Sequence, residues 1–245
     1  MTDVRVTPPA MFVADRRTFT DPLQGSPWSS EQTVAGFAQS PPNATLIRYA
    51  ESLGAREGFQ VVDIGCGAGR NLVPLAQLGC RVFGVDLSWP MLRAAAERVR
   101  NAGLEGRVTF AAAAMHQLPV KWAVADLIVA HGIWNLARSG REFRCAVREA
   151  TRIAKPGAGL FVFTFSRSTL PPGARPLPGE PFAYTQFSGE PQTFLTAQQL
   201  TSELAYAGFI PDPAVPLTEH DKRPAGTLPV AGPPVIYEGA FRYRG

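Results

Sequence analysis

The stretch of the sequence best suited to chemistry reads VVDIGCGAGR, in which three glycines follow a short apolar run. A buried strand that ends in a glycine-rich turn lets the backbone approach a nucleotide-like ligand closely. Gly65, Gly67 and Gly69 give the spacing G-x-G-x-G, so Arg70 stands where the dinucleotide fingerprint G-x-G-x-x-G has its third glycine. Asp63, just before the turn, suits a cationic ligand better than a pyrophosphate. The turn therefore disfavours a nicotinamide dinucleotide.

A second acidic residue ends the next predicted strand. The segment GVDLS places Asp86 21 residues after Gly65 (86 − 65 = 21). In a strand–helix–strand unit, an acid near this spacing accepts hydrogen bonds from the ribose of a bound nucleotide. Together, VVDIGCGAGRN and GVDLS resemble the first two motifs of class I S-adenosylmethionine-dependent methyltransferases. The cofactor of that family is positively charged at sulfur, carries an amino acid and a ribose, and has no phosphate.

The resemblance implies S-adenosylmethionine as the cofactor and assigns residues of both motifs to it. The backbone at Gly65, Cys66 and Gly67 would lie against the methionine part, and Asp86 would bind the ribose hydroxyls. Asp63 would contact the amino group or brace the turn. We expect Cys66 to be a small packing residue rather than a nucleophile, because nothing near it in the sequence predicts a lowered pKa.

The resemblance also predicts the adenine contacts, with one departure from the family pattern. Leu87 would lie against the adenine face. Many family members carry Gly-Asp-Ala after the third strand, and that Asp accepts a hydrogen bond from the adenine amino group. Here the sequence reads AAAAMHQLP, so Ala114 replaces the acid, while the backbone N–H of Met115 could still donate to the ring. Loss of one such acceptor weakens binding by about 1 kcal/mol. A non-catalytic protein of the same fold therefore remains an alternative.

Methyl transfer requires an acceptor held in line with the methyl group, and a base only if that acceptor must lose a proton. His131 follows the fourth predicted strand, where it could be a catalytic base, a cofactor contact or a wall residue. Trp28 and Trp134 are the expected aromatic residues of the acceptor pocket. Glu219 and His220 form an acid–imidazole pair in a predicted loop over residues 217–233, and we expect that pair to be solvated.

The elements that must position these residues alternate regularly along the chain. Apolar strands separated by amphipathic helices predict a parallel sheet covered on both faces, and crossover handedness then favours a doubly wound α/β fold. The resemblance implies a Rossmann-like sheet of seven strands, mostly parallel, with the last one antiparallel. The predicted strands are FQVVDI, RVFGVDL, RVTFAAA, ADLIVAHG and GLFVFTFS, followed by strands from Phe209 and in VIYEGAFRYR.

Two segments differ in composition from this alternating region. The composition of residues 1–45 predicts an irregular N-terminal arm. Residues 46–245 are expected to form the methyltransferase domain. Within it, residues 167–195 are rich in Pro and Gly and are expected to form a lid-like insertion. Both segments would roof the acceptor pocket and exclude water from it. The aromatic residues available for this are Trp28 and Phe37 in the arm, and Phe182, Tyr184, Phe187 and Phe194 in the insertion.

The composition restricts the remaining function classes. The 245 residues carry a net charge of +4, from 24 basic and 20 acidic side chains that are scattered along the chain, so nucleic-acid binding is not expected. No apolar run approaches the ~20 residues of a membrane span, and the N-terminus does not resemble a secretory signal. Three widely spaced cysteines without a CxxC pair predict neither a disulfide framework nor a metal site. A cytoplasmic location is expected.

The expected function is methyl transfer from S-adenosylmethionine to a small molecule with an oxygen, nitrogen or sulfur nucleophile. The stretch HGIWN supports a small acceptor, because amino-methylating DNA enzymes of the family carry Asn/Asp-Pro-Pro-Tyr/Phe there. The alternatives are a non-catalytic protein that binds S-adenosylmethionine or its demethylated product and, less favoured, a nicotinamide-dependent oxidoreductase. The sequence specifies neither the acceptor nor the oligomeric state.

Overall fold

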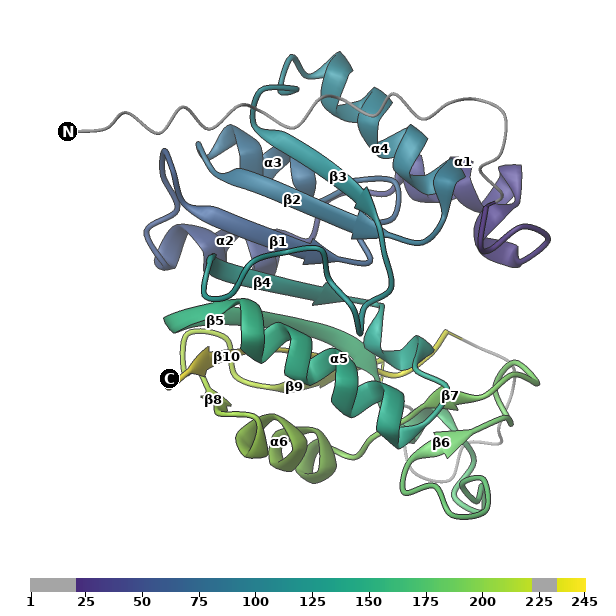
Figure 1. Ribbon diagram of the computed structural model, residues 1–245. Coiled ribbons are helices and arrows are strands. Elements are labelled where there is room, and N and C mark those ends of the chain that lie inside the picture. Colours follow the sequence, from purple (N-terminus) through teal and green to yellow (C-terminus); the bar gives the residue numbers. More distant parts are fainter. Residues whose placement is uncertain (1–20, 222–232) are drawn as a thin grey trace.

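The computed structural model describes residues 21–221 and 233–245 of the chain. In these residues one eight-stranded sheet, of order β3-β2-β1-β4-β5-β10-β8 with β9 paired to β10, is covered on both faces by helices (Figure 1). The strand order reverses between β1 and β4, which is where ligands bind in doubly wound sheets. The strands are β1 (Gln60–Ile64), β2 (Arg81–Asp86), β3 (Val108–Ala112), β4 (Ala125–His131), β5 (Ala154–Phe165), β8 (Phe209–Pro211), β9 (Thr218–His220) and β10 (Ile236–Tyr243).

The sheet has the predicted topology. Neighbouring strands from β3 to β5 are parallel, and β10 is antiparallel to both β5 and β8. The doubly wound, mostly parallel fold is therefore confirmed, including the antiparallel pair at its end. Eight strands are present where seven were expected, because two short strands share the last position. β8 pairs with residues 241–243 of β10, and β9 pairs with residues 236–238.

Besides α1 (Glu31–Gln39), four α-helices begin where the sequence supplies a capping side chain. In each, the side chain accepts a hydrogen bond from the backbone N–H three residues later, which satisfies one of the free donors of the first turn. The shorter helix α3 (Leu72–Gln77) follows the glycine turn without such a cap. The capped helices are α2 (Ala44–Ser52) after Asn43, α4 (Trp89–Asn101) after Ser88, α5 (Gly140–Ile153) after Ser139 and α6 (Ala197–Tyr206) after Thr196.

The helices bury two apolar clusters, one on each face of the sheet. Side chains of α2, α3 and α4 pack in one cluster, and those of α5 and α6 pack in the other (Figure 1). Within the described ranges, no helix is both long and apolar enough to cross a membrane. One face of α5 is buried against the sheet: Phe143, Ala146, Val147, Ala150 and Ile153.

The predicted irregular arm is wrong for its described part, because residues 21–45 are largely helical. A 3-10 helix, η1 (Pro27–Ser29), leads into α1 (Glu31–Gln39), and α2 begins at Ala44. Ser30 caps α1 by accepting a hydrogen bond from the backbone N–H of Thr33, and α1 packs against α4. Local capping and this tertiary contact stabilise a nine-residue helix that is too short to be stable alone. Residues 1–20 of the arm lie outside the described residues.

The insertion 167–195 has little regular structure, as predicted. It contains the 3-10 helix η3 (Arg167–Thr169) and a two-stranded ribbon formed by β6 (Ala183–Tyr184) and β7 (Gln192–Thr193). Three of its four aromatic residues are buried and anchor the insertion on the α5 side, whereas Phe187 is 42% exposed. The buried residues are Phe182, Tyr184 and Phe194.

Candidate functional site

The predicted site residues meet at the carboxyl ends of β1, β2 and β4. The glycine turn follows β1, Asp86 ends β2, and His131 ends β4. The register supports this proximity, because Asp63 of β1 pairs with Gly84 of β2 and with Val129 of β4. Side chains that are scattered over about seventy positions of the sequence (131 − 63 = 68) therefore share one edge of the sheet.

The three glycines of the turn all have positive φ, with values of 72° at Gly65, 52° at Gly67 and 78° at Gly69. A Cβ atom on Gly65 would lie 2.7 Å from the Cβ of Ile133, just after β4. A Cβ atom on Gly69 would lie 3.0 Å from the Cβ of Ala95 in α4. Gly69 thus permits close helix packing one residue earlier than in the dinucleotide fingerprint, so the side chain of Arg70 does not disrupt that packing.

The Asp86 carboxylate is fixed beside the glycine turn. Its Oδ2 accepts a hydrogen bond of 2.9 Å from the Gly67 N–H, and its Oδ1 accepts one of 2.9 Å from the Ser88 N–H. Burial raises the pKa of Asp86, while these backbone donors act in the opposite direction. Each carboxylate oxygen has two lone pairs. The two oxygens can therefore accept further hydrogen bonds from a pair of adjacent hydroxyl groups.

Asp63 is a buried carboxyl group with unused hydrogen-bonding capacity. The residue is 2% exposed, and its Oδ1 has no hydrogen-bond partner among the described residues. Burial raises the pKa of Asp63 to about 7; the charge of Arg70 opposes this rise, and that of Asp86 adds to it. A cationic ligand nearby would favour the ionised form. The position thus suits a positively charged or hydrogen-bond-donating ligand.

Replacing Asp63 with asparagine should remove a pH-dependent cost in stability. The pKa of Asp63 is about 7 in the folded chain and 3.8 in the reference state, so its ionisation destabilises the ligand-free fold progressively as the pH rises between these values. The free energy of unfolding of Asp63→Asn, relative to the unsubstituted protein, should therefore increase from about pH 5 to about pH 8. Urea denaturation at both pH values, without cofactor, measures it. A difference independent of pH would contradict the raised pKa.

His131 is half-buried beside the cationic side chain of Arg70. Its ring stacks on Phe163 with centroids 4.1 Å apart and an interplanar angle of 11°. Its Nε2 lies 2.8 Å from Arg70 Nη2 and 3.2 Å from Asn43 Nδ2. Burial, and then the charge of Arg70, lower the pKa of His131 to about 3. At neutral pH the imidazole is uncharged and a weak base, with its acceptor nitrogen facing two donors, which disfavours the role of catalytic base.

Asn43 connects four parts of this region, a role that its identity as a helix cap did not reveal. Its Oδ1 caps α2, and its backbone N–H donates to Asn71 Oδ1 at 3.0 Å, just after the glycine turn. Its Nδ2 lies within hydrogen-bond distance of His131 and donates to Glu238 Oε1 at 2.7 Å. The network depends on residues far apart in the sequence, so only the tertiary structure identifies it. Arg70 and Asn43 are the polar residues of the site that the motifs did not predict.

Of the residues predicted to contact adenine, Ala114 and Met115 follow β3, close to Asp86, and Leu87 directly follows Asp86 at the end of β2. The backbone N–H of Ala113 donates to the Asp86 carbonyl oxygen at 3.1 Å, and a turn closed by the Gln117 N–H and the Ala114 carbonyl oxygen comes next. Ala114 and Leu87 are half-buried, whereas the side chain of Met115 is 8% exposed and belongs to the core. Only the backbone of Met115 is therefore suited to the predicted contact.

Cys66 has the packing role expected from the sequence. It is 7% exposed, and a Cβ atom on Gly84 would lie 3.0 Å from its Sγ. Burial, together with the nearby carboxylates of Asp86 and Asp63, raises the pKa of the Cys66 thiol well above its usual range. A thiol that resists ionisation is a poor nucleophile.

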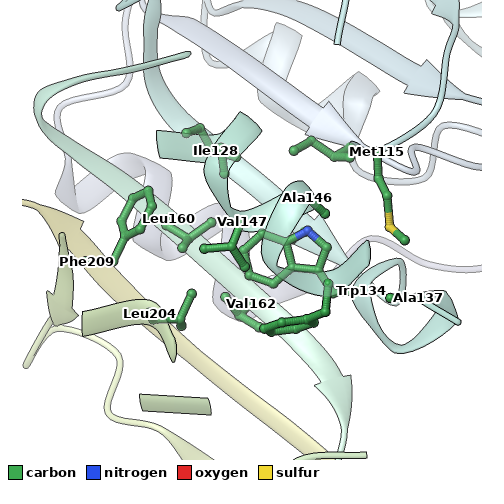
Figure 2. Packing of buried hydrophobic residues seen from close by; sticks show 14 of the residues in the cluster. Met115, Ile128, Trp134, Ala137, Ala146, Val147, Leu160, Val162, Leu204 and Phe209 are labelled. Carbon is green, nitrogen blue, oxygen red and sulfur yellow. The ribbon is translucent and has the colours of Figure 1, made fainter. Parts of the chain in front are cut away.

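The two tryptophans predicted for the acceptor pocket differ in position. Trp134 is fully buried in the core on the α5 side (Figure 2), and its ring packs edge-to-face on Phe143. Its prediction as a pocket residue is therefore wrong, because the turn after β4 directs the ring beneath the insertion. Trp28 is half-buried, and its carbonyl oxygen accepts a hydrogen bond from Ser88 Oγ. It contacts Phe37, whose ring lies 3.6 Å from the position of a Cβ atom on Gly67. The arm therefore lies over the glycine turn.

A separate cleft of about 430 Å³ lies between α2 and the β9–β10 pair. Glu238 lines it, and its Oε2 lies 3.6 Å from His220 Nε2. Glu219 and His220 were expected as a solvated pair in a loop, but they are adjacent residues of β9, so their side chains point to opposite faces. Glu219 accepts a hydrogen bond from Ser166 Oγ instead. The glycine turn does not line this cleft.

Comparisons with known proteins agree with the motifs. Residues 61–157 match the family described as a methyltransferase domain. The methyltransferase GfsG of Streptomyces halstedii is 30% identical over 155 residues, which cover 60% of this chain and 52% of the relative. The ubiquinone/menaquinone biosynthesis C-methyltransferase UbiE of Syntrophotalea carbinolica is 36% identical over 115 residues, which cover 46% of each chain. The chain spans about half the length of the curated relatives it matches.

Solved methyltransferases share the fold at lower identity. The 1,6-didemethyltoxoflavin-N1-methyltransferase of Burkholderia thailandensis, solved with bound S-adenosylhomocysteine, aligns with a TM-score of 0.61 at 19% identity and covers 82% of this chain and 77% of its own. A SAM-dependent methyltransferase from Methanosarcina mazei aligns with a TM-score of 0.61 at 20% identity, and the alignment covers 83% of this chain and 99% of the Methanosarcina chain. At these identities the alignments establish the fold.

Proposed function

We propose that this chain transfers a methyl group from S-adenosylmethionine to a small-molecule acceptor, because residues 61–157 match a methyltransferase domain and the fold aligns with solved S-adenosylmethionine-dependent methyltransferases. Relatives named for ubiquinone/menaquinone biosynthesis, and a norajmaline N-methyltransferase of Rauvolfia serpentina that is 30% identical over 118 residues, support a small acceptor. From the sequence we expect the reacting atom of the acceptor to be an oxygen, nitrogen or sulfur, whereas the UbiE relatives are named C-methyltransferases.

The observation that carries this proposal is the Asp86 carboxylate bonded to the backbone of the glycine turn. The turn offers bare backbone where a methionine chain can lie, and the carboxylate beside it suits the ribose hydroxyls. Asp63 offers a buried carboxyl oxygen without a partner among the described residues, which suits the ammonium group. Leu87 and the backbone of Ala114 and Met115 complete the adenine side.

When bound, S-adenosylmethionine supplies an electrophilic methyl group, so the main task of the chain is to align an acceptor. The largely buried glycine turn and the half-buried Trp28 limit the access of water to the place where the cofactor would bind. The described part of the arm and the insertion 167–195 act as covers over the domain 46–245. Arg70 and Asn43 hold His131 at the end of β4, where its neutral ring forms a wall of the site.

This role of His131 predicts an imidazole that does not titrate near neutral pH. Because its pKa is lowered to about 3, its ring signals in an NMR titration should stay constant between about pH 5 and pH 8. The sequence has three histidines, so the spectrum of His131→Gln identifies the signal by its absence. A titration with a midpoint between about 6 and 7 would restore the catalytic-base interpretation.

Calorimetric titration tests the function. Binding of both S-adenosylmethionine and S-adenosylhomocysteine, without binding of NAD, is expected. An acceptor screen that detects S-adenosylhomocysteine formation then separates catalysis from the alternative, a non-catalytic binding protein of the same fold. Binding of NAD alone would support the oxidoreductase and overturn the proposal.

The remaining expectations concern where the protein acts and with what. A cytoplasmic location and the absence of nucleic-acid and membrane partners stay predictions from composition and cysteine usage. Fractionation of cells that express the protein, and gel-shift titration with RNA and DNA, would test them.

A further inference from the structure

Three phenylalanines form a partly exposed aromatic cluster at the carboxyl end of β5. We call it the aromatic shelf; it consists of Phe165, Phe187 and Phe194. The ring centroid of Phe165 lies 5.3 Å from that of Phe187 and 5.8 Å from that of Phe194, and the Phe187 and Phe194 centroids are 5.7 Å apart. Phe194 is fully buried, Phe165 is half-buried, and Phe187 is 42% exposed. The shelf thus has a buried base and an open upper side.

The position of the shelf relates it to the candidate site. His131 at the end of β4 pairs with Phe163 of β5, so Phe165 lies two residues further toward the carboxyl edge. Ile133, which contacts the glycine turn, packs against the same buried cluster as Phe165. Ligands of doubly wound sheets bind beyond these strand ends. The shelf therefore lies at the same edge of the sheet as the candidate site.

The shelf is held in place from several sides. The Phe194 N–H donates to the Phe182 carbonyl oxygen at 2.9 Å, and Thr193 Oγ1 donates to the Trp134 carbonyl oxygen at 2.8 Å. The Arg167 guanidinium lies 5.0 Å above the ring of Tyr184, which also contacts Phe194. A surface that is already ordered loses little entropy when a ligand binds to it.

Exposed aromatic side chains are few in the part of the chain that the structure describes. The large apolar side chains exposed there are Phe37, Trp122, Phe187 and Tyr206. Phe37 and Phe187 belong to the two segments that lie beyond the carboxyl ends of the strands, α1 and the β6–β7 region (Figure 1). Trp122 and Tyr206 precede β4 and β8 and lie at the opposite edge of the sheet. Both segments at the carboxyl edge of the sheet, α1 and the β6–β7 region, therefore present an exposed aromatic side chain.

We propose that the methyl acceptor is a flat aromatic compound that stacks on the aromatic shelf, with Phe165 and Phe187 as its specificity-determining residues. This inference rests on the proposed function. Aromatic rings bind one another in offset or edge-to-face arrangements that add to simple apolar burial. An aliphatic acceptor of the same size gains the burial but not the ring contact. The shelf therefore selects for aromaticity in addition to apolar character.

The test compares 2-naphthol with decahydro-2-naphthol, which share a hydroxyl group and a bicyclic frame but differ in aromaticity. Each compound is titrated into the protein saturated with S-adenosylhomocysteine, and binding is followed by saturation-transfer NMR. We expect 2-naphthol to bind roughly three- to ten-fold more tightly. Phe187→Leu, which keeps an apolar side chain but removes the ring, should abolish most of this preference. Tyr206→Leu, which removes an exposed ring at the opposite edge, should leave the preference unchanged.

The outcomes separate the two proposals. Equal binding of the two compounds, or a preference that survives in both Phe187→Leu and Phe165→Leu, would overturn the aromatic acceptor. Calorimetric titration of each variant with S-adenosylhomocysteine should give the affinity of the unsubstituted protein, which shows that the variants are folded. Failure of the unsubstituted protein to bind S-adenosylhomocysteine would instead overturn the proposed function.

Discussion

Asp86→Ala should abolish measurable binding of S-adenosylmethionine, with an affinity loss of roughly 100-fold or more, because two charge-assisted hydrogen bonds to the ribose are removed. The substitution also removes the acceptor for the Gly67 and Ser88 N–H groups, so the turn loses its support. Calorimetric titration with S-adenosylmethionine and with S-adenosylhomocysteine measures the loss. Both ligands should be affected equally, since both carry the ribose.

Asp126→Ala is the matched control for this experiment. Asp126 is also a carboxylate that accepts a backbone N–H, from Gln60 at 2.8 Å, and it pairs with Lys155 at 2.8 Å. It lies at the opposite edge of the sheet, near the start of β4. Its removal should lower the free energy of unfolding without changing cofactor affinity. Unchanged affinity in Asp86→Ala, with the fold intact by circular dichroism, would remove the main support for the proposed function.

Gly65→Ala should have the second large effect, on both stability and binding. A Cβ atom at this position would lie 2.7 Å from the Ile133 Cβ, and the φ of 72° is unfavourable for any residue with a side chain. Overpacking and backbone strain together should reduce the free energy of unfolding by about 2–4 kcal/mol. Because the turn must shift away from β4 to relieve the contact, cofactor binding should fall as well.

Gly132→Ala separates strain from steric clash. Gly132 has a φ of 73°, nearly the same as that of Gly65, but a Cβ atom there would meet no atom within 4 Å beyond its chain neighbours. Gly132→Ala should therefore lower the free energy of unfolding by backbone strain alone, by about 1 kcal/mol. Urea denaturation and titration with S-adenosylhomocysteine, applied to both variants, give the comparison. Equal losses in the two variants would show that contact with Ile133 does not constrain the turn.

The two segments that cover the carboxyl edge of the sheet, the described part of the arm and the insertion 167–195, differ in how well the sequence predicted their structure. Composition correctly identified residues 167–195 as poor in regular structure, since Pro and Gly disfavour both helices and strands. It missed α1, because that helix depends on packing against α4 as well as on its Ser30 cap. It also assigned Trp134 to the pocket, although the ring is buried in the core. Burial of an aromatic residue after a strand depends on which face of the sheet the chain takes next.

The parallel strands, the glycine turn and the acid at the end of the second strand could be predicted from the amino-acid sequence, because strand alternation, helix caps and motif spacing are local properties. The environment of His131 could not be predicted in this way, because it depends on Asn43, Arg70 and Glu238 from three other elements. The same holds for the aromatic shelf, whose rings come from β5 and from a distant ribbon. Protonation and packing depend on neighbours in space, and these become known only when the chain is folded.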